Sequence, residues 1–395
     1  MTMEKIIKID EILGRQFNGE RLSYARKYRG LSVTELAEKV GVQRQTVSMY
    51  ENNKLTNPEY DKIKKFSEIL NFPTRFFMEK SNVEFEKSAT YFRSLMTTNK
   101  IYRAEQEVKI ELISIIYEFL SEYLDFQPLN LPDVDIGTSP EEAAAILREH
   151  WKLGNRPIDN LIYLAESHGL VVAGFNSNSD AVDAFSHKIS SDLTDTYLIG
   201  YSKNKSSATR IHFDIAHELG HILLHNWKED LECVDKSEFN YMENQAHKFA
   251  AAFLLPAETF VPDVLGYEGQ LSHYIELKKK WKVSISAMII RAKDLGLITP
   301  EAYQKMMRNM QKMGIRKKEP LDDILTTAKP SLLKQAVVAL FEDGNFTPKE
   351  LIDELSSLYG LTLNPELIEE LLNLPTGMMQ VKNDLKVSIQ LKDRR

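Results

Sequence analysis

Two histidines and a glutamate stand at a chemically useful spacing in the segment His217-Glu218-Leu219-Gly220-His221. On a helix, residues four apart lie one above the other, so His217 and His221 can direct imidazole nitrogens at one metal ion. Glu218 flanks that face and can take a proton from a water bound to the ion without ligating the ion itself. The pattern predicts a zinc hydrolase centre with Zn2+ as its cofactor.

A catalytic zinc usually takes three protein ligands and keeps one position open, so a third ligand is expected. Glu243 is the choice, 22 residues after His221. The run 243–255, which Pro256 stops, predicts a second helix. That helix carries a surface of small residues on which the motif helix could pack closely: Ala246, Ala250 and Ala251. This packing would place Glu243 opposite the two histidines.

Two further histidines lie near this pattern. His225 continues the spacing of four but drifts about 80° around a helix from His217, so we interpret it as a helix-terminal or supporting residue. His247 shares the face of Glu243 and could orient a ligand or replace Glu243. The stabiliser of a reaction oxyanion stays unassigned, with three weak candidates: Tyr241, His273 and Tyr274.

The same motif also occurs by chance in helices, where its histidines are solvated or paired with acids. Here six of the nine histidines fall within residues 212–273, and apolar residues flank the motif on both sides. Buried histidines without partners are costly, so this context favours the metal site.

The first 80 residues predict a series of short helices that are typical of a helix-turn-helix. Their expected bounds are Arg21–Tyr28, Val33–Val40, Arg44–Asn52, Glu59–Leu70 and Thr74–Glu79. Ser32 and Glu35 form a capping box that starts the second of them. On the third helix four side chains are expected to project outward: Arg44, Gln45, Ser48 and Met49. Arg and Gln make paired hydrogen bonds to guanine and adenine edges, which favours double-stranded DNA as a partner.

Residues 15–75 resemble the XRE/Cro repressor-type helix-turn-helix family. The resemblance is carried by Arg26, Gly30-Leu31-Ser32, Glu35-Leu36-Ala37, Gly41-Val42, Thr46-Val47-Ser48 and Tyr50-Glu51-Asn52. It implies DNA binding. The alternatives are a plain helical bundle or a helix-turn-helix reused for protein contact.

Polar residues 81–98 predict a linker, and residues 99–124 predict one long amphipathic helix. Packing into the core is the favoured interpretation of its apolar stripe, and a homodimer helix is the alternative. Three short strands are expected before the motif helix, at 169–175, 184–189 and 196–201. A sheet edge beside the motif helix would let an extended peptide pair with it, which favours a peptidase. Residues 332–341, 348–359 and 365–372 predict helices, and 382–384 could turn a hairpin.

Residues 140–310 resemble the ImmA/IrrE metallopeptidase family. The residues that carry this resemblance are Arg210, Phe213, Ala216-His217-Glu218-Leu219-Gly220-His221, Leu224-His225, Glu243, Ala246, Phe249-Ala250 and Leu254-Leu255-Pro256, followed by Leu277, Trp281, Val283-Ser284, Ala287, Ile290, Arg291-Ala292 and Leu295-Gly296-Leu297-Ile298. The resemblance implies a zinc endopeptidase that cleaves a transcriptional repressor, with His217, His221 and Glu243 as ligands and Glu218 as catalyst. His247 is a departure, since the family usually has Asn there.

The composition of the 395-residue chain, 43% hydrophobic and 27% charged, is typical of a soluble protein of two or three domains. One cysteine excludes an internal disulfide framework, and no long apolar segment or signal peptide is visible, so a cytoplasmic protein without a membrane partner is expected. The net charge of −7 is unevenly distributed, because residues 1–80 carry 15 Lys and Arg against 11 Asp and Glu. That excess favours the first segment as the polyanion-binding part.

Together these patterns predict a mostly helical α+β protein with four parts. They are a five-helix helix-turn-helix domain (1–80), a linker with the long helix (81–139), a zincin-like domain with a small sheet and the motif helix (140–315), and a C-terminal helical or winged-helix-like region of unknown role (316–395). The expected function is a DNA-binding regulatory zinc endopeptidase. The alternative is a transcription factor, antitoxin or anti-repressor whose peptidase-like domain senses or binds without cutting.

Overall fold

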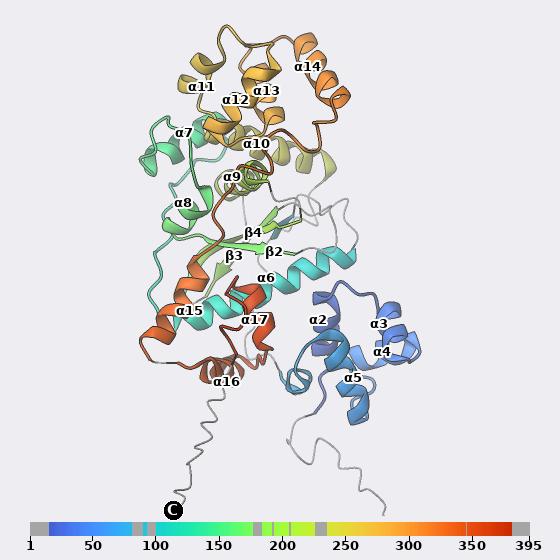
Figure 1. Cartoon of the computed structure of the whole chain (residues 1–395). Helices are drawn as coiled ribbons and strands as arrows, with labels where there is room; N and C mark the ends of the chain where they lie inside the picture. Colours follow the sequence, from blue (N-terminus) through green and yellow to red (C-terminus); the bar gives the residue numbers. More distant parts are fainter. Residues whose placement is uncertain are drawn as a thin grey trace, which may run out of the picture.

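The computed structural model is mostly helical, with helices on both sides of one small sheet (Figure 1). It describes residues 16–80, 90–92, 100–176, 184–191, 193–204, 207–225, 235–344 and 346–380. The predicted α+β class is confirmed. Within the described residues, no helix is both long enough and apolar enough to cross a membrane.

The helix-turn-helix unit forms at the predicted places. Its elements are α2 (Gly19–Tyr28), α3 (Val33–Val40), α4 (Arg44–Glu51), α5 (Tyr60–Leu70) and η1 (Thr74–Met78). Ser32 and Glu35 complete the capping box of α3, and Gly41 ends that helix with a φ of 79°, which a glycine adopts without strain. The fifth predicted helix is a 3-10 turn rather than an α-helix, because Pro73 sets its start and only five residues follow before extended backbone.

Helix α6 (Lys100–Ser121) is the predicted long helix, and it runs beneath the sheet. Its apolar stripe is buried inside the chain at Val108, Leu112, Ile115 and Phe119. The side of α6 away from the sheet meets α2, where the Tyr24 hydroxyl donates to the Val108 carbonyl at 3.3 Å. Core packing therefore accounts for the stripe.

The sheet contains the three predicted strands, β2 (Val171–Phe175), β3 (Ala184–Ser190) and β4 (Asp195–Ser202), and one that was not predicted. The additional strand, β1 (Thr90–Phe92), comes from the expected linker. The strand order is β1-β3-β4-β2, with β2 parallel to β4 and the other neighbours antiparallel. Three residues in a polar segment give no periodic signal, so β1 is recognisable only from its pairing with β3.

Both faces of the sheet are covered, and successive side chains of a strand enter different cores. Val171, Ala173 and Phe175 belong to a core shared with α6, the helix-turn-helix unit and the C-terminal helices. Val172 belongs to a second core that contains the motif helix and the helices after it. This explains why β2 is apolar along its whole length.

The second core is built from eight helices that follow α6. They are α7 (Pro140–His150), α8 (Leu161–Ser167), α9 (Ala208–Leu224), α10 (Lys236–Leu254), α11 (Ala257–Val264), α12 (Leu271–Trp281), α13 (Ile285–Asp294) and α14 (Pro300–Lys312). Helix α9 carries the motif. Helix α10 begins seven residues before the predicted start at Glu243, because Asp235 caps it by accepting from the backbone N–H groups of Ser237 and Glu238.

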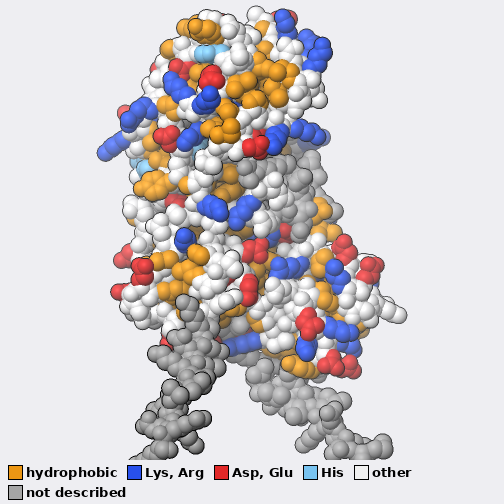
Figure 2. Space-filling model, viewed as in Figure 1, with side chains coloured by type: hydrophobic (Ala, Val, Ile, Leu, Met, Phe, Trp, Pro, Cys, Tyr) orange, Lys and Arg blue, Asp and Glu red, His pale blue; other side chains and the backbone are white. Residues whose placement is uncertain are grey.

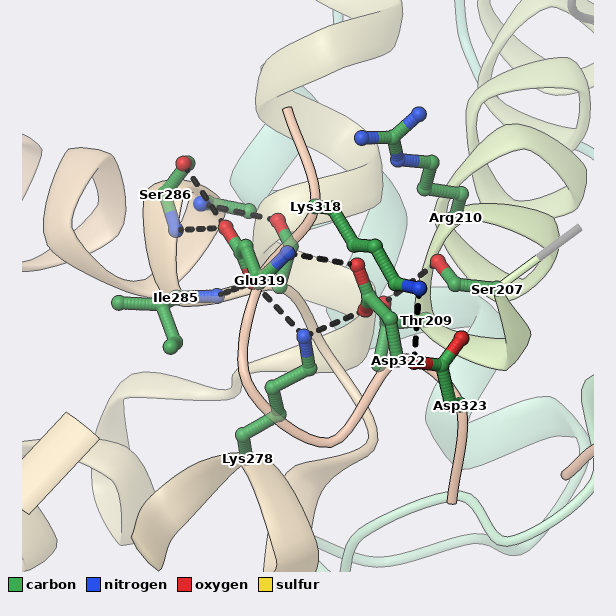
Figure 3. A network of polar contacts seen from close by, with 12 residues as sticks. Ser207, Thr209, Arg210, Lys278, Ile285, Ser286, Lys318, Glu319, Asp322 and Asp323 are labelled. Atoms are coloured by element: carbon green, nitrogen blue, oxygen red, sulfur yellow. Dashed lines mark hydrogen bonds and ion pairs between the residues drawn. The ribbon is translucent and has the colours of Figure 1, made fainter. Parts of the chain in front are cut away.

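The segment after α14 that contains Lys317, Glu319 and Asp322 makes polar contacts with α9, α12 and α13 (Figure 3). The fully buried Lys278 ammonium lies 2.9 Å from Glu319 and 2.6 Å from Asp322, so its charge is compensated. Glu319 also accepts the backbone N–H groups of Ile285 and Ser286 at the start of α13. Arg210 on α9 donates to the carbonyl of Lys317 in the same segment. This last bond connects the segment to the first turn of the motif helix.

The chain ends in three predicted helices, α15 (Leu332–Glu342), α16 (Pro348–Tyr359) and α17 (Pro365–Leu371). Glu166 on α8 accepts the backbone N–H groups of Ser331 and Leu332 at the start of α15. Figure 1 shows these helices beside α6, near the helix-turn-helix unit. The hairpin expected at 382–384 lies outside the described residues.

Candidate metal centre

Helices α9 and α10 pack closely because both present small residues at the crossing. A Cβ added to Gly220 would lie 3.1 Å from the Ala246 backbone and 3.0 Å from the Phe249 ring. The alanines expected on the surface of the second helix are buried: Ala246, Ala250 and Ala251. The crossing brings the face of α9 that carries His217 and His221 against the face of α10 that carries Glu243.

Three ligand-type side chains converge at this crossing. The Nε2 atoms of His217 and His221 are 3.0 Å apart. One Glu243 oxygen lies 3.5 Å from His217 Nε2, and the other lies 3.2 Å from His221 Nε2. Both histidines are 2% exposed, so water has little access to the polar atoms of this cluster.

The cluster fits a zinc ion. Nitrogen and carboxylate donors bind zinc at about 2.1 Å, so two donors on a tetrahedral ion lie roughly 3.4 Å apart. The two imidazole nitrogens are 3.0 Å apart, and each lies within 3.5 Å of one of the two Glu243 oxygens. Two imidazoles and one carboxylate are also a donor set that catalytic zinc sites use, with one position left open.

The protonation states agree with ligation. Burial lowers the pKa of His217 well below its usual value, so the ring is neutral near pH 7. For Glu243, burial acts to raise the pKa, but hydrogen bonds with His217 and His221 outweigh it and the pKa is lowered. A neutral imidazole beside a carboxylate anion is the state that a metal ion requires.

A chain of hydrogen bonds fixes the orientation of His221. Gln245 Nε2 donates to the Tyr241 hydroxyl at 3.1 Å, so Gln245 Oε1 faces His225 Nε2 at 3.2 Å. An amide oxygen only accepts, hence His225 Nε2 carries the proton. Burial lowers the pKa of His225 to about 4, so the neutral ring accepts on Nδ1, which lies 2.9 Å from His221 Nδ1. His221 therefore keeps the lone pair of Nε2 toward the cluster.

His225 is the residue that ends α9, with extended backbone angles of −118° and 151°. It accepts the hydrogen bond from His221 Nδ1, the ring nitrogen of His221 that faces away from the cluster. The expected helix-terminal position is thus observed. Sequence reasoning missed Gln245, because a glutamine within a helix gives no distinctive signal.

His247 lies at the border of the cluster. Its ring centroid is 4.4 Å from that of His217, and His217, Glu243 and His247 each offer a ligand atom within 4.8 Å of the others. His247 Nδ1 bonds the Glu243 carbonyl at 2.7 Å, which assigns the proton to Nδ1 and the lone pair to Nε2. Both readings of His247, as a ligand and as a supporting residue, are compatible with this position.

Glu218 is buried on the side of α9 that faces the sheet. Its Oε2 accepts a hydrogen bond of 2.6 Å from the Ser186 hydroxyl of β3. Both side chains are 1% exposed or less. Ser186 was not singled out in the sequence, since a serine within a strand carries no signal of its own. The bond aims the carboxylate and connects the motif helix to the strand beside it.

The three weak candidates for the oxyanion stabiliser have different surroundings. Tyr241 is exposed and accepts from Gln245, as described above. His273 bonds the Asp263 carbonyl at 2.7 Å, and the Tyr274 hydroxyl donates to the Glu268 carbonyl at 3.1 Å. The last two are therefore engaged within the α11–α12 region.

Helix α4 presents its first residues to solvent. Arg44 and Gln45 are exposed, whereas Ser48 and Met49 are half-buried and Val47 anchors the helix in the core. Figure 1 shows α3 and α4 at the right-hand edge of the unit, to the right of α2. In the view of Figure 2, positive and negative side chains are interspersed over the visible face of this unit.

Comparison with known proteins agrees with both resemblances. Residues 165–293 match the family model of the IrrE N-terminal-like domain, and residues 22–77 match that of a helix-turn-helix. Relatives include the HTH-type transcriptional regulators SinR of Bacillus licheniformis and of Bacillus subtilis (strain 168). Each is 36% identical over 69 residues, which are 17% of this chain and 62% of the relative. The chain thus spans less than two thirds of those relatives, within its helix-turn-helix segment.

Proposed function

We propose that this chain, in which a helix-turn-helix precedes an IrrE-like domain, is a DNA-binding regulatory zinc endopeptidase that cleaves a transcriptional repressor. The observation that carries the proposal is the joint placement of two groups of residues. His217, His221 and Glu243 converge at one point, while Glu218 on the same helix is held by a strand of the sheet.

His217, His221 and Glu243 would hold the zinc ion. Zinc bound there would polarise a peptide carbonyl and acidify water near neutral pH. Glu218 accepts the proton of the attacking water and then delivers it to the leaving amine nitrogen. Ser186 aims the Glu218 carboxylate through its hydrogen bond. An extended peptide could align along the side of β3 that pairs with β1 in this structure.

The DNA-binding part would use α4 in the major groove. Arg44 and Gln45 stand at its N-terminal end, which is the end that reads base edges in this motif. A DNA-bound helix-turn-helix on the same chain would raise the local concentration of the peptidase where repressors sit. This supports a repressor as the substrate class.

The decisive experiment compares the wild type with Glu218→Gln. The substitution keeps side-chain size and the three proposed ligands, and it removes the base, so cleavage of a candidate repressor should fall about 100-fold or more. Repressor loss and derepression of its genes are followed together, with the exposed Glu301→Gln as the matched control. If Glu218→Gln derepresses as well as the wild type and no protein is cut, the chain senses or binds without cutting.

The DNA-binding part is tested by selection from a random duplex pool. Arg44→Ala or Gln45→Ala should cost about 1 to 3 kcal/mol in binding and relax the sequence preference. Affinity should also fall with added salt, because phosphate contacts release counterions. The exposed Lys65→Ala on α5 is the control, with no expected change in preference. Failure to enrich any sequence would favour a protein-contact role for this unit.

A further inference from the structure

Strand β1 closes the edge of the sheet that lies beside the candidate centre. It pairs antiparallel with β3, with Thr90 opposite His187, Tyr91 opposite Ser186 and Phe92 opposite Phe185. The other side of β3 is occupied by β4 along its whole length. Among the described residues, β1 therefore takes the one side of β3 that β4 leaves open.

This edge is adjacent to the proposed general base. Ser186, which pairs with Tyr91, donates its hydroxyl to Glu218 at 2.6 Å. Directly opposed residues of an antiparallel pair have Cα atoms about 5 Å apart. The backbone of Tyr91 thus lies next to the strand residue that holds Glu218.

Extended peptides commonly bind proteins by adding a strand to an exposed sheet edge. A protein substrate of the proposed peptidase needs such an edge near Glu218, and that edge is the side of β3 that β1 covers. Resting on the proposed function, we infer that the Thr90–Phe92 segment occupies the substrate position, and that an extended substrate must displace it.

The dimensions of the strands make displacement feasible. Strand β3 has seven residues, and β1 pairs with three of them, Phe185 to His187. A longer peptide can pair along more of β3 and gain more ladder bonds than β1 makes. The covalent connection of β1 to the rest of the chain opposes this displacement, because it gives β1 a high effective concentration at β3. The segment is a short internal competitor.

The test uses the full chain with Glu218→Gln, so that bound peptide is not cut, and a fluorescent peptide with the sequence of residues 84–98 as the probe. Two further variants are compared, Tyr91→Pro and Phe92→Pro. Neighbouring residues of an edge strand direct their N–H groups to opposite sides, so one of these prolines removes a ladder bond to β3 and the other does not.

The variant that loses the ladder bond should bind the probe at least 10-fold more tightly. Amide hydrogen exchange of β3 should be faster in that variant, and added probe should slow it again. A variant with glycine at 90, 91 and 92 should behave in the same way, which covers the case of a misfolded proline variant.

Unchanged probe affinity and unchanged β3 exchange in all these variants would overturn the inference. So would tighter binding without a change in exchange at β3, because the probe would then bind elsewhere. Cleavage within residues 84–98 of the zinc-loaded wild type, detected by mass spectrometry, would also overturn it, because the segment would then be a substrate rather than a competitor. Probe binding and exchange need no turnover, so a failure of the proposed peptidase activity is distinguishable from a failure of this inference.

Discussion

At the residue scale, the candidate metal centre depends on which nitrogen of each histidine carries a proton. His225 and Gln245 assign that proton for His221, and the Glu243 carbonyl assigns it for His247. Metal sites lose affinity when such supporting hydrogen bonds are removed, even though no ligand is touched. Substitution of a proposed ligand should therefore lower zinc affinity more than substitution of a residue that orients a ligand.

Purified protein should contain about one zinc per chain, measured by elemental analysis and by competition with a chelator. Glu243→Ala should abolish stable binding, whereas His225→Ala should weaken it by about 10 to 100-fold, because His221 loses its orienting partner. If His247→Ala strips the zinc and Glu243→Ala leaves it bound, His247 rather than Glu243 is the third ligand.

Ser186 provides a second prediction at this scale. Ser186→Ala removes the hydrogen bond that stabilises the Glu218 carboxylate, so kcat should fall about 10-fold and the acid limb of the pH–rate profile should move to higher pH. Zinc content should stay the same. Ser186→Thr keeps a hydroxyl and should restore part of the rate. An unchanged pH profile in Ser186→Ala would show that the serine only fills space.

At the scale of elements, the distance between α9 and α10 sets the geometry of the centre, because each helix carries part of the donor set. Gly220 and Ala246 allow the close approach. The segment that carries Glu319 also contacts the first turn of α9, where Arg210 donates to the Lys317 carbonyl. The donors are thus placed by helix packing rather than by a loop.

Gly220→Ala tests this packing. Its Cβ would meet the Ala246 backbone at 3.1 Å and the Phe249 ring at 3.0 Å, and at least the backbone can yield only by moving α10. The gain in helix propensity is about 1 kcal/mol, and overpacking costs about 1 to 3 kcal/mol, so a net loss of stability is expected.

Zinc affinity should fall with it, because Glu243 moves with α10. The matched control is Gly269→Ala, whose added Cβ meets nothing within 4 Å. Urea unfolding and chelator competition measure the two effects. Wild-type zinc affinity in Gly220→Ala would contradict the dependence of the centre on this crossing.

At the scale of the whole molecule, the helix-turn-helix unit is joined to the far end of the chain. Glu79 is 1% exposed and accepts hydrogen bonds from the Ser356 hydroxyl at 2.7 Å and the Thr362 N–H at 2.8 Å. Arg21 on α2 donates to the Gly360 carbonyl at 2.7 Å. The helix-turn-helix unit and the C-terminal helices also share one core with α6 and one face of the sheet, so they belong to one packed body.

Glu79→Ala should therefore destabilise more than the helix-turn-helix unit. It leaves a buried donor on Ser356 and a half-buried donor on Thr362 without their acceptor, which should lower the free energy of unfolding by about 3 kcal/mol. Limited trypsin digestion should then release the unit more rapidly. The exposed Glu68→Ala on α5 should change stability by less than about 0.5 kcal/mol. Equal effects of both substitutions would contradict the docking role of Glu79.

The sequence by itself determined the elements whose signals are local. Helix α3 has the predicted bounds because its capping box and Gly41 act within a few residues, and α16 has them because Thr347, Glu350 and Gly360 do the same. The spacing of four likewise put His217 and His221 on one face of a helix before any packing was known.

Only the tertiary structure decided which residues from distant segments meet. Ser186 reaches Glu218 from 32 positions away, Thr362 reaches Glu79 from 283, and β1 is a strand only because β3 lies beside it. Such contacts depend on how helices and strands pack, and a single serine or a three-residue polar segment carries no periodicity that would reveal its partner. Local chemistry thus indicated where a metal could bind, while long-range packing placed the carboxylate-holding serine and the covered sheet edge next to it.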